Sequence, residues 1–109
     1  IIRWILAGGL PVELFLLYAN KTEADIIFRA EWDNTAREHG NFHCYHVLSE
    51  PPPGWSQGTG RISDDILRRH LPPPGPDTSI FLCGPPPMVD ALETALKSLG
   101  HAEQAIILP

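Results

Sequence analysis

Basic stretches, long apolar stretches and cysteines are all scarce in this sequence, and each scarcity excludes a class of protein. The 109 residues carry a formal net charge of −5 without an extended run of lysine or arginine. We therefore expect no nucleic-acid partner, because phosphate binding requires a basic face. No apolar run reaches the ~20 residues of a membrane-spanning helix, so we expect no membrane segment in this chain. The two cysteines, Cys44 and Cys83, are too few for a disulfide scaffold and are expected to be free thiols in a reducing compartment.

What the sequence does contain is a regular alternation of strand and helix patterns. Its length and its hydrophobic share of 43% suit one compact domain. The expected helices cover 1–6, 22–39, 63–70 and 88–99, and the expected strands cover 13–19, 42–48, 78–83 and 104–108, with a loop over 50–60. Such alternation predicts parallel strands joined by right-handed crossovers, with helices on both faces, which is a doubly wound α/β sheet. The strand over 13–19 is nearly continuously apolar and is predicted to be buried on both faces.

A cysteine followed by a glycine and three prolines is the most specific feature of the chain. Cys83 stands at the end of an apolar strand, where open α/β sheets bind their ligands. The prolines at 85–87 stiffen the loop and remove three backbone N–H donors. Such a loop suits a planar ligand. It does not suit the phosphate cradle of a cysteine phosphatase, which needs backbone N–H groups and a basic partner.

Four segments resemble one known family, and together they cover nearly the whole chain. These are the segments over 16–26, 48–62, 71–74 and 83–88. They are similar to the nicotinamide-binding domain of NADH–cytochrome b5 reductases and of the reductase module of assimilatory nitrate reductases, both in the ferredoxin–NADP reductase superfamily. The resemblance implies that residues 1–109 are a partial NAD(P)H-binding domain. Its first strand, its glycine-rich loop and the FAD-binding domain are expected to lie before Ile1.

The resemblance also implies a reaction and its participants. Hydride would pass from NADH to FAD, which the FAD-binding domain of the same polypeptide would hold. Electrons would then pass singly to a haem protein such as cytochrome b5. The expected location is intracellular, on the cytoplasmic side, with any membrane anchor outside these residues. The chain alone is expected to be inactive, and apolar surface around Leu14, Leu16 and Phe81 is expected to be exposed.

By the same resemblance, Cys83 lies against the nicotinamide ring and helps to position it. Gly84 permits close approach of the backbone, and Pro85 and Met88 line the pocket. The alternative role for Cys83 is that of a small hydrophobic residue buried in the core. Tyr18, Ala19 and Asn20 are implied to lie beneath the ribose and the pyrophosphate; the alternative is a plain turn between a strand and a helix.

Ser49 and Glu50 depart from the family pattern. NADH-using members usually carry an aspartate at the position of Ser49, and NADP-using relatives often carry serine followed by arginine. Here an acid follows the serine. Glu50 would repel a 2′-phosphate and accept hydrogen bonds from a ribose, so NADH is the expected cofactor and NADPH the less favoured one. The C-terminus also departs, because residues 106–109 lack the aromatic residues that are common in the family.

Three features of the sequence admit other interpretations. A metal site could be suggested by His39, His43 and His46 with Cys44. Residues 43 and 44 point to opposite faces of a strand, as do 43 and 46, so we expect no metal. The triple prolines could be polyproline ligands, yet each is short and lies between predicted elements. A truncated module that only binds a nucleotide or a partner chain, without catalysis, remains the alternative function.

Overall fold

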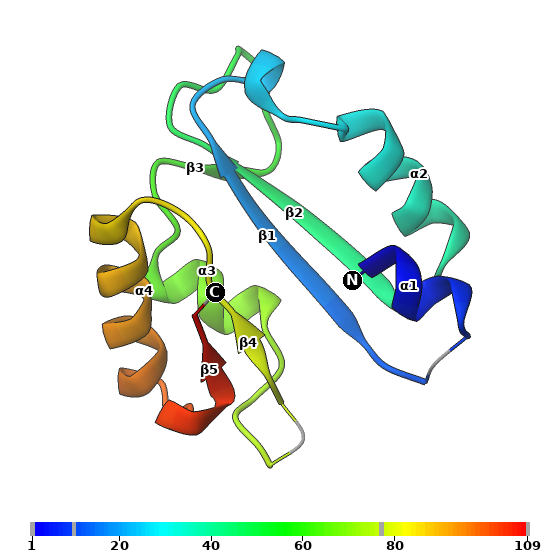
Figure 1. Ribbon diagram of the computed structural model, residues 1–109. Helices are drawn as coiled ribbons and strands as arrows, with labels where there is room; N and C mark the ends of the chain where they lie inside the picture. Colours follow the sequence, from blue (N-terminus) through cyan, green and yellow to red (C-terminus); the bar gives the residue numbers. More distant parts are fainter. Residues whose placement is uncertain (1, 10, 77, 109) are drawn as a thin grey trace. The chain divides into compact units, whose positions relative to one another are not determined.

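The computed structural model describes residues 2–9, 11–76 and 78–108, in which helices and parallel strands alternate (Figure 1). The chain divides into two compact units, residues 1–61 and 62–109, each of which is described by itself. The first unit contains α1 (Ile2–Ala7), β1 (Leu14–Asn20), the 3₁₀ helix η1 (Glu23–Asp25), α2 (Arg29–Glu38), β2 (Phe42–Leu48) and β3 (Gly58–Thr59). The second contains α3 (Asp64–His70), β4 (Ile80–Phe81), α4 (Pro86–Ser98), the 3₁₀ helix η2 (Glu103–Ala105) and β5 (Ile106–Ile107). Ile1, the first residue of the helix expected over 1–6, lies outside the described residues, as does Pro109 of the C-terminal segment over 106–109.

The first unit is built on a parallel sheet with the strand order β1-β2-β3. β1 pairs with β2 over seven residues, from Leu14 opposite Phe42 to Asn20 opposite Leu48. β3 joins the other edge of β2, with Thr59 opposite Leu48. Because the strands are parallel and in this register, their carboxyl ends lie next to one another at one edge of the sheet.

β3 was not predicted, because the segment over 50–60 was expected to be a loop throughout. The strand has only two residues and no hydrophobic pattern. It forms through pairing with β2, where Gly58 lies so close to Val47 that an added Cβ would be 2.9 Å from Cγ2 of that residue. A glycine is therefore what allows this backbone to approach β2.

The core of the first unit lies around β2. Phe42, Val47 and Leu48 are almost completely buried, and α2 packs on this strand, with the rings of Trp32 and Phe42 5.9 Å apart. β1 was predicted to be buried on both faces, which is wrong: its residues are half-buried, and Phe15 is 38% exposed. The reason is that β1 is an edge strand of the described sheet.

The predicted helix over 22–39 is interrupted. Thr22 and Asp25 form a capping box around η1 instead of opening a long helix. Phe28 then adopts a left-handed conformation with φ of 58°, and α2 begins only at Arg29. Non-glycine residues seldom adopt this conformation, so the hydrophobic periodicity of the segment gave no sign of it.

The second unit pairs two short parallel strands, β4 and β5, and packs α3 against α4. The side chain of Ser63 caps α3 by accepting a hydrogen bond from the backbone N–H of Ile66. Leu67, Leu92 and Leu96 supply buried core residues. Glu93 and Lys97 form an i,i+4 ion pair on α4, with Oε1 and Nζ 3.1 Å apart.

Three boundaries in the second unit differ from the prediction. β4 covers only Ile80–Phe81 of the strand expected over 78–83, and η2 replaces the start of the strand expected over 104–108. α4 begins at Pro86, two residues before Met88. Proline is tolerated in the first turn of a helix because its missing N–H would have no partner there. Phe81 is 62% exposed, as expected, whereas Leu14 and Leu16, which were also expected to be exposed, are half-buried.

The predicted fold class, a parallel α/β arrangement, is confirmed by the three strand pairings, all of which are parallel. Within the described residues, none of the helices has the length and apolar character needed to cross a membrane.

Candidate functional site

The carboxyl edge of the β1-β2-β3 sheet brings together the candidate residues of the first unit. Tyr18, Ala19 and Asn20 end β1 and are half-buried, whereas Ser49 and Glu50 follow β2 and are exposed. The backbone N–H of Ser49 donates to the carbonyl of Asn20 at 3.1 Å, and that of Glu50 donates to the carbonyl of Lys21 at 2.8 Å. These bonds fix the two loops side by side where open parallel sheets bind ligands.

Asn20 presents a buried hydrogen-bond donor at this edge. Among the described residues, its side-chain nitrogen Nδ2 is buried and has no hydrogen-bond partner. A buried polar group without a partner costs free energy, so an unpaired amide at a ligand-binding edge calls for an explanation. A ribose hydroxyl or a pyrophosphate oxygen is the kind of acceptor that would satisfy it. The residues at the edge therefore fit the adenosine and pyrophosphate part of a dinucleotide.

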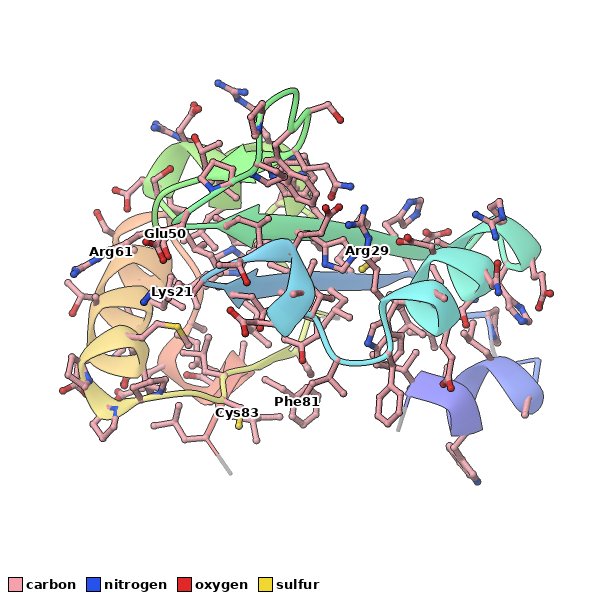
Figure 2. All side chains as sticks on the ribbon, turned by 90° about the horizontal axis from the view of Figure 1, so that it is seen from above. Lys21, Arg29, Glu50, Arg61, Phe81 and Cys83 are labelled. Carbon is pink, nitrogen blue, oxygen red and sulfur yellow. The ribbon has the colours of Figure 1, made fainter. Side chains whose placement is uncertain are left out.

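The charged groups at this edge include an ion pair that the sequence did not reveal. Nζ of Lys21 lies 3.4 Å from Oε2 of Glu50, and Figure 2 shows both side chains beyond the carboxyl ends of β1 and β2, with Arg61 at the same end. Lys21 was missed because the pairing depends on two segments that are 29 residues apart. Only the parallel register of β1 and β2 brings them together.

The candidate residues of the second unit form the loop between β4 and α4. Cys83 is exposed and its thiol is free, so the alternative that it is a small buried hydrophobic residue is wrong. Gly84 has a φ of 156°, and a Cβ added to it would be 2.1 Å from Cε of Met88. Pro85 precedes α4, and its carbonyl accepts from the N–H groups of Met88 and Val89 at 3.0 and 3.1 Å. The methionine side chain therefore occupies the space beside Gly84 in which a larger residue would place its Cβ.

A cluster of titratable side chains between β2 and α2 was also missed. His46 is 1% exposed, and its Nε2 lies 3.5 Å from Oδ1 of Asp33 on α2 and 3.6 Å from Sγ of Cys44. Alternation along the strand would have placed Cys44 and His46 on one face. His43 lies on the other face and pairs with Glu13.

This cluster supports the packing of β2 and is not arranged for nucleophilic catalysis. Asp33 and Cys44 approach the same ring nitrogen of His46, so the ring does not link a nucleophile to an orienting carboxylate through its two nitrogens, as a catalytic triad requires. Burial raises the pKa of the Cys44 thiol to about 11, and the carboxylate of Asp33 adds to the rise. The thiol therefore stays protonated at neutral pH and is a poor nucleophile.

Arg29 ties the loop before β3 to α2. Its guanidinium lies 5.1 Å from the ring centre of Trp55 and forms ion pairs with Glu23 and Asp33. The indole N–H of Trp55 donates to the carbonyl of Gly58 at 3.0 Å. These contacts hold β3 in place beside β2.

Comparison with known proteins places these features in a family. Residues 1–94 match the family model described as the oxidoreductase NAD-binding domain. The chain is 42% identical over 96 residues to NADH-cytochrome b5 reductase 1 of Aspergillus terreus, which covers 88% of this chain and 32% of that protein. It is 46% identical over 94 residues to NADH-cytochrome b5 reductase 1 of Bos taurus, which covers 84% of this chain and 31% of that protein. The chain thus spans about a third of the length of the curated relatives it matches.

Solved structures show the same fold. The cytochrome b5 reductase domain of Ulva prolifera nitrate reductase has a TM-score of 0.93 and 35% identity, covering 99% of this chain and 42% of that one. The CS-b5R domains of human Ncb5or, solved in the NAD⁺ form, have a TM-score of 0.84 and 26% identity, covering 98% of this chain and 31% of that one.

Proposed function

Because the chain belongs to the oxidoreductase NAD-binding domain family, we propose that it is the NAD(P)H-binding part of a flavin-dependent reductase. In this proposal hydride passes from NADH to FAD, and electrons pass onward to a haem protein such as cytochrome b5. The names of the fungal and bovine relatives support the NADH and cytochrome b5 parts of the proposal. Dinucleotide binding by this chain rests on the buried Asn20 amide, which lacks a partner among the described residues at the edge where ligands bind.

The adenosine ribose and the pyrophosphate are assigned to the carboxyl edge of the β1-β2-β3 sheet. Tyr18 and Ala19 form the floor beneath them, and the Asn20 amide donates to an oxygen of the ligand. The hydroxyl of Ser49 and the carboxylate of Glu50 accept hydrogen bonds from the ribose hydroxyls. An acid that accepts from the ribose 2′-OH is a common feature of NAD-binding sites, and this supports NADH as the main cofactor.

The nicotinamide ring is assigned to the loop of the second unit. Gly84, Pro85 and Met88 would bound one side of the ring, and the exposed Cys83 thiol would hold its reacting edge. The bound cofactors supply the hydride chemistry, and the protein supplies placement. Since reacting atoms must approach to roughly 3–3.5 Å, small errors of orientation slow the transfer strongly.

The remaining participants belong to the same proposal. Residues 1–109 would be a partial NAD(P)H-binding domain, and the FAD-binding domain of the same polypeptide would be its direct partner. The protein would work inside the cell, on the cytoplasmic side, with any membrane anchor outside these residues. A second candidate is a non-catalytic module that binds a nucleotide or a partner chain.

The flavoprotein that carries this chain tests the proposal by stopped-flow reduction of its flavin with NADH. The variant Cys83→Ala is expected to slow flavin reduction by about tenfold to a hundredfold through misplacement of the ring, with little change in the Kd for NADH. Cys44→Ala is the matched control and leaves the reduction rate unchanged. A wild-type rate in Cys83→Ala would remove this thiol from the site. A wild-type flavin that NADH does not reduce would favour the non-catalytic module.

A further inference from the structure

β1 forms a long edge of the first sheet without the features that usually protect such an edge. Among the described residues, β2 pairs with one side of β1 and no strand pairs with the other (Figure 1). Its seven residues contain neither a proline nor a charged side chain, and its register with β2 is continuous. Sheet edges in native proteins are usually short, charged, bulged or interrupted by proline. β1 is therefore open to pairing with a further strand.

The hydrogen bonds to β2 show which backbone groups of β1 point to the open edge. The N–H of Leu14 and the carbonyl of Asn20 bond to the residues that flank β2, at 2.8 and 3.1 Å. Because a strand bonds to each parallel neighbour through alternate residues, the even-numbered residues of β1 bond to β2. The N–H and C=O groups of Phe15, Leu17 and Ala19 therefore point away from β2, to the open edge.

We propose that two copies of this chain pair through the open edges of β1, as antiparallel strands related by a twofold axis perpendicular to the sheet. Such an axis uses the same surface on both copies and closes the assembly at two. When the strands Leu14–Asn20 overlap completely, Leu17 lies opposite Leu17 of the second copy. Phe15, Leu17 and Ala19 then fall in the pairs of the antiparallel ladder whose two residues exchange both N–H···O=C bonds. The inference goes beyond the proposed function and does not depend on dinucleotide binding.

The register of complete overlap is also the one in which the side chains complement each other. It places Phe15 opposite Ala19 of the second copy, so that a large side chain meets a small one. One residue beyond each strand end, it places Glu13 opposite Lys21 of the second copy, and this happens at both ends of the pair. Opposite charges facing each other across a strand pair are favourable. A shift by two residues in either direction loses both matches. This self-complementarity is the reason to assign the edge to a second copy rather than to an unrelated strand.

The two charged residues at the ends of the strand can change partners at little cost. In the single chain Glu13 pairs with His43, and Lys21 pairs with Glu50 and also acts electrostatically on Asp25. The side chains of Glu13 and Lys21 are 63% and 71% exposed. Exposed ion pairs contribute little stability, so replacing them by pairs between two copies is not opposed by a large loss.

The test is the Kd for dimerisation of the 109-residue chain, measured by sedimentation equilibrium at concentrations up to the millimolar range. The wild-type chain is expected to dimerise weakly, as small interfaces do. Glu13→Lys and Lys21→Glu each set like charges opposite each other at both ends of the pair, and each is expected to raise this Kd by about tenfold. The double variant Glu13→Lys/Lys21→Glu restores opposite charges and is expected to return the Kd to the wild-type value. The control Lys97→Glu, which reverses a cation on α4 of the second unit, is expected to leave it unchanged.

Hydrogen exchange of the backbone amides locates the contact between the two copies. The N–H groups of Phe15, Leu17 and Ala19 are expected to exchange more slowly as the protein concentration rises, whereas those of Leu16 and Tyr18, which face β2, are expected to change little. A chain that stays monomeric at millimolar concentration overturns the proposal and leaves the edge to another strand. A dimer that leaves the three outward N–H groups unprotected uses another surface and overturns it too, as does a double variant that dimerises no better than the single ones. None of these results affects the proposed function, because dinucleotide binding is measured separately.

Discussion

One methyl group added at Gly58, where β3 meets β2, is expected to lower the stability of the fold measurably. An alanine Cβ at this position would lie 2.9 Å from Cγ2 of Val47 and 3.0 Å from Cε2 of Tyr45. Attractive contacts between carbon atoms lie at roughly 3.5–4.0 Å. Val47 is completely buried, and its β-branched side chain has few alternative rotamers. Gly58→Ala is therefore expected to lower the free energy of unfolding by about 1–3 kcal/mol, the usual cost of overpacking a core.

Urea unfolding of the 109-residue chain measures this cost, and Gly40→Ala is the control. A Cβ at Gly40 meets no atom within 4 Å, and this glycine has no positive φ. Gly40→Ala should leave the stability unchanged or raise it by up to about 1 kcal/mol, because alanine restricts the unfolded chain. If Gly58→Ala is as stable as Gly40→Ala, the reasoning that a glycine is needed for β3 to pair with β2 is refuted.

Three further predictions concern the site and its supports. Glu50→Arg in the complete flavoprotein is expected to shift kcat/KM toward NADPH, and an unchanged ratio for the two cofactors would contradict the placement of the ribose. Iodoacetamide at pH 8, with labelling followed by mass spectrometry, is expected to label Cys83 in the native chain and Cys44 only after unfolding. The reason is that a pKa of about 11 leaves about one Cys44 thiol in a thousand ionised. Equal labelling of the two thiols in the native chain would contradict this. Ser63→Ala is expected to cost about 0.5–1 kcal/mol in urea unfolding through loss of the N-cap of α3, whereas Ser63→Asp keeps the stability; equal losses in the two variants would count against the cap.

Local sequence patterns predicted the elements that local physics determines. β2 has the expected bounds, Phe42–Leu48, because its continuous β-favouring run leaves no alternative. The cap of α3 by Ser63 and the end of α4 before Gly100, whose φ is 101°, follow from side-chain chemistry and from glycine freedom. The turn after Asn20 and the loop around Cys83 could also be located from their local sequence.

Features that depend on distant partners could not be predicted. The break at Phe28 and the two-residue strand β3 have no hydrophobic periodicity of their own. The unpaired Asn20 amide and the Lys21–Glu50 ion pair appear only when β1 and β2 are set in register. The strand ends that carry the candidate residues could be located from motifs, but the charged groups that lie beside them could not.

Titration of the ¹⁵N-labelled 109-residue chain with NADH, followed by NMR, tests the central claim most directly. The side-chain NH₂ signal of Asn20 is expected to shift as it gains an acceptor, together with the backbone N–H signals of Ser49, Cys83 and Gly84. Lys97 and its neighbours on α4 are expected to stay unshifted. Unchanged Asn20 and Cys83 signals at millimolar NADH would contradict the claim that this chain binds a nicotinamide dinucleotide at these two sites.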